Sequence, residues 1–361
     1  MSSEIGRNIR LTIFGQSHGE AIGGVIDGLP PGESIDMDAV HDFMARRAPG
    51  QNKYSTPRRE TDLPIVLSGL TDGKTCGAPL CFIIHNQNTK SGDYAAFSSM
   101  PRPAHADYTA YIRYGGHADM CGGGHFSGRL TAPICFAGAV ASQILARQGI
   151  FVGAHIENIG DIYDDAYDSV SLTKEGLTLH NAFPVLNAEK GAKMQEAIEN
   201  ALQNGDSIGG SIACAAIGLP AGIGNPMFDG IENRLSAAIF GIPAVRGIAF
   251  GAGFAAAKMR GSVHNDSFYY DGDRVLTRTN NHGGILGGIT SGMPLHFHVA
   301  IKPTPSISRV QETIDLLKGT DASLSVRGRH DPCIVPRAVP CIEAMTAFIL
   351  LDFLKGEYQC N

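Results

Sequence analysis

The sequence predicts a single α+β domain over residues 1–361. Hydrophobic residues make up 43% of the chain and charged residues 18%, proportions typical of a compact globular protein and not of a disordered chain. Runs with strand character alternate loosely with helical patterns, without the regular βαβ rhythm or the strand-then-GxGxxG fingerprint of a dinucleotide-binding domain. No stretch of biased composition indicates a linker, so we divide the chain no further.

Six short apolar runs predict strands. They lie at Leu11–Phe14, Pro64–Leu67, Leu80–His85, Ser211–Leu219, Gly247–Phe250 and Pro294–Ile301. The last run alternates apolar with polar residues, which is the period of a half-buried strand.

Helical periodicity predicts six helices, at about 38–47, 133–148, 188–203, 229–240, 308–318 and 337–355. The first has Asp36 or Asp38 as a candidate N-cap and Pro49-Gly50 as its stop. The fourth begins after Asp229, and Ser308 is a candidate cap for the fifth.

Charge and cysteine usage exclude several classes of protein. A net charge of −6 argues against a nucleic-acid partner, and no apolar run approaches the roughly 20 residues that would cross a membrane. The beginning of the chain lacks the basic-then-apolar pattern of a signal peptide. The eight cysteines form no CxxC pair and no dense framework, which favours a reduced, cytoplasmic protein.

The segment Gly328–Arg337 is the most informative stretch of the chain. Two prolines restrict its backbone, and the apolar run that follows indicates a helix opening near Pro336. Titratable groups on a stiff loop before a buried helix favour a functional site, and the alternative is a helix entry held by an ion pair. The charged or titratable residues are Arg329, His330, Asp331 and Arg337.

Two more segments carry candidate chemistry near the beginning of the chain. Ser17-His18 is flanked by glycines after a strand, which exposes an imidazole that can donate a proton near neutral pH; the alternative is a turn capped by serine. The second, Arg46–Asp62, brings five cations into an acidic protein and predicts an anion site, the alternative being a solvated loop.

Two further segments combine glycines with polar residues. Arg102–Tyr108 runs toward the triple glycine of Gly122–Arg129, which could offer backbone N–H groups to a phosphate but is no P-loop. The histidines nearby match no zinc spacing, so we expect no metal. Asn280–Ile289 and Lys302–Ser306 suggest a cradle for a planar or phosphorylated ligand, or else a hairpin with polar turns.

Taken in order, these segments resemble the chorismate synthase family from end to end. The matching pieces are Phe14–Gly32, Arg46–Asp62, Arg102–Tyr108, Asn280–Gly288, Lys302–Ser306 and Gly328–Met345. The resemblance implies a fold of helices sandwiched between antiparallel β-sheets, assembled as a homotetramer. It also implies the reaction, in which 5-enolpyruvylshikimate 3-phosphate loses phosphate and a ring C6 proton by anti-1,4-elimination to give chorismate, with reduced FMN required.

The resemblance also implies roles for individual residues. His18 donates a proton to the departing phosphate, His105 manages protonation of the reduced cofactor, and Asp331 relays the C6 proton from flavin N5, with Ser17 and Ser127 assisting. The implied substrate-binding residues are Arg47, Lys53, Arg59, Arg102, Arg129 and Arg337. The implied FMN-binding residues are His125, Phe126, Ser127, Pro243, Ala244, Gly287, Lys302, Pro303, Thr304, Pro305, Ser306 and Arg329. Whether the chain reduces FMN itself with NADPH stays open.

The chain departs from the family pattern around residues 118–131. Three expected arginines are replaced by Ala118, Cys121 and His125, and we expect each charged hydrogen bond lost to cost about 1.5–3 kcal/mol of phosphate binding. A protonated His125 would recover part of that. The presumptive proton-transfer residues survive, which favours a working enzyme over a non-catalytic flavin-binding paralogue with an altered Gly122–Arg129 loop. A weaker alternative is a different phosphate-ester lyase or hydrolase.

Overall fold

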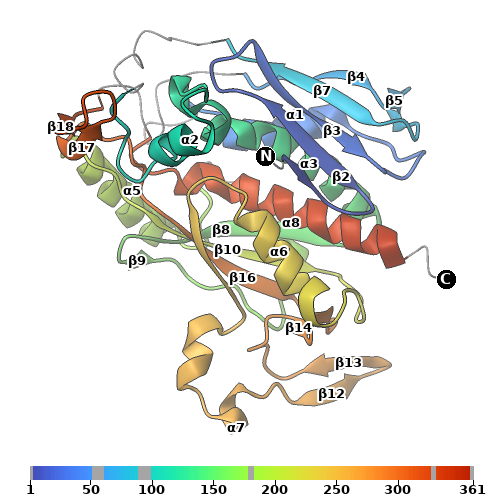
Figure 1. Ribbon diagram of the computed structural model, residues 1–361. Helices are drawn as coiled ribbons and strands as arrows, with labels where there is room; N and C mark the ends of the chain where they lie inside the picture. The colour runs from blue at the N-terminus through green and yellow to red at the C-terminus, as the bar shows by residue number, and fades with distance from the viewer. Residues whose placement is uncertain (1–2, 51–60, 88–98, 178–182, 327–330, 358–361) are drawn as a thin grey trace.

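The computed structural model describes residues 3–50, 61–87, 99–177, 183–326 and 331–357 (Figure 1). Two five-stranded antiparallel sheets enclose a layer of helices, as the resemblance predicted. The first sheet has the order β1 (Glu4–Ile5), β2 (Arg10–Gly15), β3 (Ala21–Asp27), β7 (Leu80–His85) and β4 (Ile65–Ser68). The second has the order β11 (Val245–Phe250), β16 (Leu295–Ile301), β10 (Gly210–Ile217), β8 (Phe151–Ile159) and β9 (Ile162–Tyr163).

Three helices fill the space between the sheets: α1 (Met37–Arg47), α3 (Thr131–Arg147) and α8 (Val335–Glu357). The predicted cap of α1 is confirmed, because Asp36 accepts hydrogen bonds from the backbone N–H groups of Asp38 and Ala39 at 2.9 and 3.2 Å. Helices α3 and α8 approach closely at Gly138, where an added methyl group would lie 2.2 Å from Ala344 Cα. Their side chains are buried nearly all round, as expected of central helices.

The expectation that no apolar run approaches the length of a membrane span was wrong, because the segment Gly128–Arg147, which contains α3, is apolar and long enough to cross a bilayer. It is 83% buried inside the structure, however, and it lies between the two sheets. Its apolar composition is therefore accounted for by the core.

Asp352, near the end of α8, connects this helix to the beginning of the chain. Its carboxylate is fully buried and accepts hydrogen bonds from the backbone N–H groups of Arg7, Asn8 and Ile9 at 2.9, 2.7 and 2.7 Å. Arg234 supplies the compensating positive charge. The segment entering β2 is thus held directly by the central helix.

Five further helices complete the helical part of the described structure. They are α2 (Asp107–Arg113), α4 (Lys174–Leu177), α5 (Ala188–Gln203), α6 (Ile231–Ile239) and α7 (Gly261–His264). Short 3-10 helices are η2 (Cys121–Phe126), η3 (Gly128–Leu130), η4 (Met227–Asp229) and η5 (Gly253–Lys258).

Four small hairpins complete the described structure. They pair β5 (Leu70–Thr71) with β6 (Lys74–Thr75), β12 (Phe268–Asp271) with β13 (Arg274–Thr277), β14 (Ile285–Leu286) with β15 (Ile289–Thr290), and β17 (Gln311–Asp315) with β18 (Thr320–Leu324).

The predicted helix at 308–318 is wrong, because β17 and β18 form a hairpin there. Asp315 accepts hydrogen bonds from the backbone N–H groups of Leu317 and Lys318, and Gly319 takes the left-handed conformation, so the chain turns back. Ser308 therefore caps no helix. Val310 and Leu317 are 73% and 78% exposed, so the apolar residues at helical spacing in this segment are not buried against the core.

Candidate active site

The Ser17-His18 turn packs against the triple glycine of η2. It connects β2 to β3, and the Ser17 backbone N–H donates to the Gly124 carbonyl at 3.1 Å. The Ser17 hydroxyl lies 3.1 Å from His18 Nδ1. A methyl group on Gly122 would lie 2.1 Å from His18 Cε1, so this close approach requires glycine. The prediction of an imidazole on a tight glycine-flanked turn is confirmed.

The same loop contacts His105. A methyl group on Gly123 would lie 3.2 Å from both Cε1 and Nε2 of His105. The triple glycine therefore brings the two candidate catalytic histidines to one place, with His18 against Gly122 and His105 against the next residue.

A buried aspartate, Asp107, holds Arg102 and His105 together. Its carboxylate accepts hydrogen bonds from Arg102 Nε at 2.8 Å and from His105 Nδ1 at 2.5 Å. Arg102 also donates to the Ser306 hydroxyl at 3.3 Å. Burial raises the pKa of the Asp107 carboxyl, but the hydrogen bonds from Arg102 and His105 outweigh it and hold that pKa well below its ordinary value.

A second buried aspartate, Asp62, holds Arg47 and Arg129. Its two oxygens accept hydrogen bonds from Arg47 NH2 and Arg129 NH1, and all three side chains are buried. Burial raises the pKa of the Asp62 carboxyl, but the positive charges of Arg47 and Arg129 outweigh it and lower that pKa. Two positive charges and one negative charge leave this cluster with one net positive charge.

Asn86 links this cluster to the His18 turn. Its side-chain oxygen accepts from Arg129 Nε at 2.9 Å, and its amide nitrogen donates to the carbonyls of Gln16 and Gly19 at 3.1 and 2.8 Å. The position of Arg129 is thereby coupled to the backbone that carries His18.

The loop before α8 reaches the same cluster. Arg337, in the first turn of α8, donates from Nε to the Arg47 carbonyl at 3.0 Å. Its guanidinium also forms an ion pair with Asp331. The predicted ion pair at the helix entry is thus present, and Arg337 joins it to Arg47 of the Asp62 cluster.

Comparisons with known proteins agree with this geometry. A family model described as chorismate synthase matches residues 9–354. The chain belongs to the chorismate synthase family. A chorismate synthase of Dehalococcoides mccartyi (strain ATCC BAA-2100 / JCM 16839 / KCTC 5957 / BAV1) is 45% identical over 358 residues, which cover 98% of this chain and 96% of the relative. One from Thermococcus gammatolerans (strain DSM 15229 / JCM 11827 / EJ3) is 44% identical, covering 97% and 96%.

A solved structure agrees as well. A crystal structure of chorismate synthase superposes with a TM-score of 0.76 at 27% identity, covering 98% of this chain and 93% of that one. As a member of the chorismate synthase family, the chain is a lyase that converts 5-enolpyruvylshikimate 3-phosphate to chorismate and requires reduced flavin.

Several residues that the chorismate synthase resemblance assigns to FMN meet beside Arg102. The Lys302 backbone N–H donates to the Ala244 carbonyl at 3.0 Å, and Lys302 Nζ donates to the Ala104 carbonyl. Burial, together with the charge of Arg246, lowers the pKa of Lys302. Thr304 Oγ1 is buried and has no hydrogen-bond partner among the described residues. The Thr304 hydroxyl and the Lys302 ammonium are groups that can bind the phosphate of a phosphorylated cofactor.

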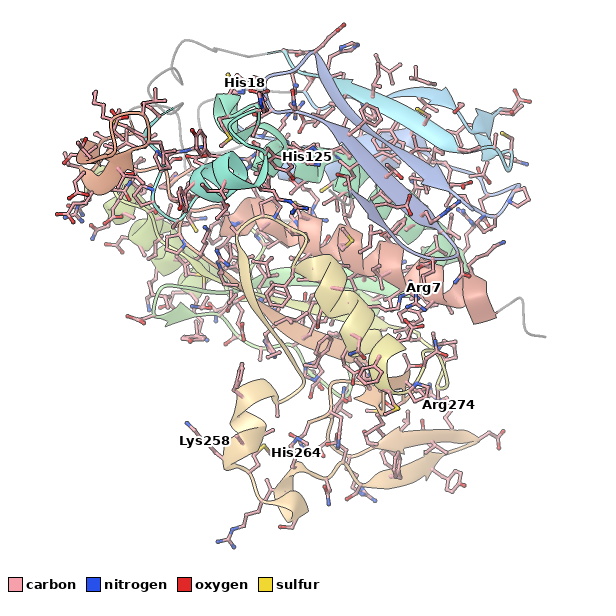
Figure 2. All side chains as sticks on the ribbon, in the orientation of Figure 1. Arg7, His18, His125, Lys258, His264 and Arg274 are labelled. Atoms are coloured by element: carbon pink, nitrogen blue, oxygen red, sulfur yellow. The ribbon has the colours of Figure 1, made fainter. Side chains whose placement is uncertain are left out.

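His125 replaces an arginine of the chorismate synthase pattern. Both of its ring nitrogens contact other residues of the protein. Its Nδ1 donates to the Gly15 carbonyl at 2.8 Å, and its Nε2 lies 3.0 Å from the Ser3 hydroxyl. Figure 2 labels His125 and His18 where the first sheet meets the η2 loop. With both nitrogens engaged, the ring fastens the η2 loop to the end of β2. Its neighbour Phe126 packs against Tyr114, and the next residue, Ser127, caps η3.

Gly287 is not brought to this corner of the chain. It lies in the β14–β15 hairpin, near the Leu295 end of β16, whereas Lys302 follows the opposite end. A seven-residue strand spans about 20 Å, so the two residues lie about a strand length apart in one chain.

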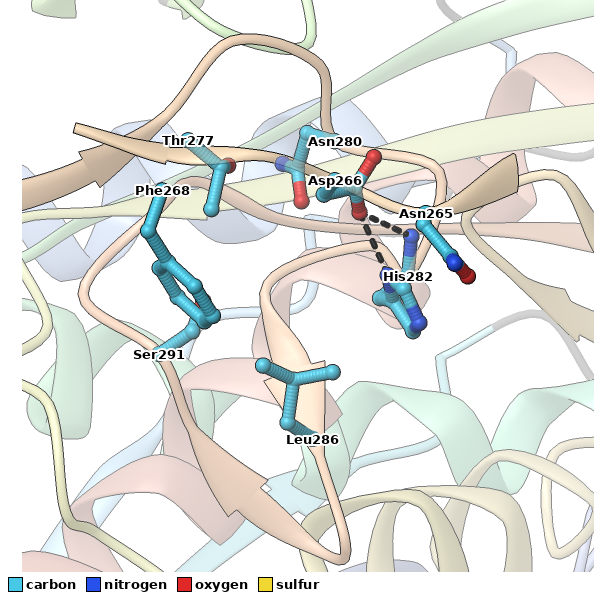
Figure 3. Close-up of a pocket in the computed structure, with 8 residues that line it drawn as sticks. All are labelled: Asn265, Asp266, Phe268, Thr277, Asn280, His282, Leu286 and Ser291. Atoms are coloured by element: carbon cyan, nitrogen blue, oxygen red, sulfur yellow. Dashed lines mark hydrogen bonds and ion pairs between the residues drawn. The ribbon is translucent and has the colours of Figure 1, made fainter. Parts of the chain in front are cut away.

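A pocket does lie beside that hairpin (Figure 3). Its volume is about 210 Å³, and its polar centre is His282, whose Nδ1 lies 2.5 Å from Asp266. Asn280 and Leu286 contribute to its lining. The segment thus forms the hairpin of the alternative, and the pocket beside it includes none of the residues Lys302–Ser306.

Some predicted residues lie outside the described part of the chain. These are the substrate-binding candidates Lys53 and Arg59, and Arg329 with its neighbour His330. Sequence reasoning assigned no role to the residues that position the site. Asp107 had a usable signal, since it follows His105 by two residues, and Asn86 directly follows a predicted strand. Asp62 carried none.

Proposed function

We propose that the cluster around the triple glycine carries out the family's anti-1,4-elimination, in which phosphate and the ring C6 proton leave 5-enolpyruvylshikimate 3-phosphate. The observation that carries the proposal is the placement of His18 and His105 on adjacent residues of one glycine loop. When bound, reduced FMN would supply a flavin nitrogen as acceptor for the C6 proton. The remaining chemistry belongs to side chains of this chain.

His18 is the acid that protonates the departing phosphate. Its turn is fixed by Asn86 on one side and by the Ser17–Gly124 hydrogen bond on the other, so the imidazole is held without rearrangement. Ser17 contacts His18 directly and assists it. Ser127 assists at the far end of the same loop, where it also begins η3.

His105 manages protonation beside the cofactor, and Asp331 passes the C6 proton onward. Asp331 is paired with Arg337, whose guanidinium holds the carboxylate in place at the start of α8. The pair is joined to Arg47 through Arg337 Nε, so the relay group is adjacent to the anion site.

The arginines hold the substrate anions as one assembly. Arg47 and Arg129 share Asp62 and retain one net positive charge, which favours a phosphate or carboxylate in a buried site. Arg47 Nε is buried and has no hydrogen-bond partner among the described residues, so a donor is available for a ligand. Arg102 and Arg337 flank the assembly, and Lys53 and Arg59 belong to the proposal on their sequence match alone.

The FMN side of the site consists of Pro243, Ala244, Lys302–Ser306 and Arg329, with Phe126 and Ser127 from the η2 loop. Its best support is the orphaned Thr304 hydroxyl near Lys302. His125 is not part of this proposal, because Gly15 and Ser3 occupy its ring.

The working unit is a homotetramer in which a neighbouring chain presents Gly287 to the cofactor. Two observations support this. Gly287 lies about a strand length from Lys302 within one chain, and the lobe that carries it exposes large apolar side chains, including Phe254 at 87% and Phe268 at 64%. Analytical ultracentrifugation tests the assembly.

The reaction takes place in the cytoplasm, in keeping with the seven described cysteines, all of which are free thiols. Anaerobic oxidation of NADPH in the presence of oxidised FMN tests whether the chain reduces its own cofactor.

Two substitutions test the assignment of roles. We expect His18→Ala and Asp331→Asn each to lower turnover at least tenfold under anaerobic conditions with photoreduced FMN, while FMN still binds. The exposed carboxylate Asp42 on α1 provides the control, and Asp42→Asn should turn over like the wild type. Near-normal rates in both test variants would contradict the roles. Flavin binding without any chorismate from the wild type would indicate the non-catalytic paralogue.

A further inference from the structure

Asp107 makes an unusually complete set of hydrogen bonds for a carboxylate at a helix start. One oxygen accepts from His105 Nδ1 at 2.5 Å and from Arg102 NH2 at 2.8 Å. The other accepts from Arg102 Nε at 2.8 Å and from the Arg102 backbone N–H at 2.9 Å. The side chain is buried, at 4% residue exposure, so these four donors take the place of water.

This geometry decides which nitrogen of His105 carries the hydrogen. An ionised carboxylate only accepts hydrogen bonds, so Nδ1 must be the protonated nitrogen. Arg102 NH2 lies 3.1 Å from the same Nδ1, but both atoms are donors, and both are directed at the shared Asp107 oxygen. Nε2 is then the nitrogen at the opposite edge of the ring, beside Gly123.

The backbone is strained to bring His105 to this position. Ala104, the preceding residue, has a φ of 58°, a left-handed conformation that residues with a Cβ rarely adopt. Its carbonyl accepts the hydrogen bond from Lys302 Nζ. A strained backbone of this kind persists only where surrounding contacts hold it in place. Here the contacts are the hydrogen bond from Lys302 to the Ala104 carbonyl and the hydrogen bond from His105 to Asp107.

We propose that Asp107 is the positioning residue for His105: it fixes the Nδ1-protonated tautomer and the ring orientation, and leaves Nε2 to act in the site. The inference rests on the catalytic role proposed above for His105. Asp107 itself is separated from the site by the imidazole and contacts no reacting atom. It orients His105 by accepting a hydrogen bond from Nδ1, the ring nitrogen opposite the one that acts in the site.

A double-mutant cycle tests the proposal by activity. Asp107→Asn removes the charge at nearly constant shape, and we expect it to lower kcat at least tenfold. In a His105→Asn background the same substitution should lower kcat less than twofold further, because there is no imidazole left to orient, whereas its effect on substrate binding through Arg102 should raise KM in both backgrounds. An equal factor in both backgrounds would show that Asp107 acts on the site independently of His105, and would overturn the proposal.

Ring ¹⁵N spectra of the ligand-free protein supply a readout that a general loss of stability would not produce. With ¹⁵N-labelled histidine, the signal absent from His105→Asn identifies His105. We expect it to show the Nδ1-protonated tautomer in the wild type and a tautomer mixture in Asp107→Asn. An unchanged tautomer in Asp107→Asn would refute the positioning role.

The chain offers a matched control. Glu157 pairs with His298 Nδ1 at 2.8 Å on the second sheet, so Glu157→Gln disturbs a carboxylate–histidine pair that has no part in the site. Its turnover should stay within twofold of the wild type. Should Asp107→Asn not fold, Asp107→Glu, which keeps the charge but displaces it, completes the same cycle. A His105→Asn enzyme with wild-type turnover would instead refute the role of His105, a result distinct from an equal factor in both backgrounds.

Discussion

Gly122→Ala should disable the site while leaving the fold intact. The added methyl group would lie 2.1 Å from His18 Cε1, whereas non-bonded carbon atoms settle at about 3.5–4.0 Å, so the ring or the loop must move by about 1.4 Å or more. A misplacement of 1 Å at a catalytic group costs on the order of 100-fold in rate. The left-handed φ of 60° adds about 1–2 kcal/mol of backbone strain, which most folded proteins survive.

Gly128→Ala is the matched control for this prediction. Gly128 lies in the same loop region, has no atom of the described residues within 4 Å of an added methyl group, and does not have a positive φ. We expect about a 100-fold loss of turnover for Gly122→Ala and less than a twofold change for Gly128→Ala, measured as chorismate formation with photoreduced FMN. Thermal unfolding of both variants checks that they fold. A Gly122→Ala enzyme within threefold of wild type would refute the claim that this glycine sets the position of His18.

Three further predictions follow from the structure. Gly138→Ala overpacks the contact with Ala344 and should lower the free energy of unfolding by about 1–3 kcal/mol in thermal or urea unfolding, whereas Gly261→Ala, in open space, should not. Because the pKa of Asp62 is lowered by folding, its ionised form stabilises the protein above about pH 4, the ordinary aspartate pKa, and this contribution is lost as pH falls through the folded-state value. The stability difference between wild type and Asp62→Asn should therefore shrink in acid, and a constant difference would contradict the pairing. His125→Ala should lower thermal stability but change FMN affinity less than threefold by fluorescence titration, since its ring bonds to Gly15 and Ser3.

The sequence predicted the elements whose periodicity is set by burial. The predicted ranges for α1, α3, α5, α6 and α8 are confirmed to within a few residues, as are six of the strands. Strand β3 was not predicted because its Gly23-Gly24 pair resembles a turn. In the sheet these glycines are required, since a methyl group on Gly23 would lie 2.3 Å from the Phe82 carbonyl oxygen. The helix predicted at 308–318 was wrong for the opposite reason. Its apolar residues have helical spacing, but in the fold they are not buried against the core.

The candidate residues of the site could be named from the sequence through the family resemblance, but their pairing with one another could not. The motif residues His18, His105 and Asp331 could be named because each lies in a short, recognisable segment. The partnership of Asp62 with Arg47 and Arg129 joins residues 15 and 67 positions apart, and only the folded sandwich brings them together. The η2 loop shows the same limit, because nothing in the sequence indicated that His125 would be held by Ser3.

The central place of α8 has a consequence for the order of events during synthesis. Every strand of both sheets leaves the ribosome before this helix does, yet α8 lies between the sheets and Asp352 binds the backbone entering β2. The sandwich cannot close, and Arg337 cannot reach Arg47, until residues 335–357 have been made. The inner faces of the two sheets therefore stay partly uncovered until this last helix has been made, and the chain completes its core and its anion site in the same final step.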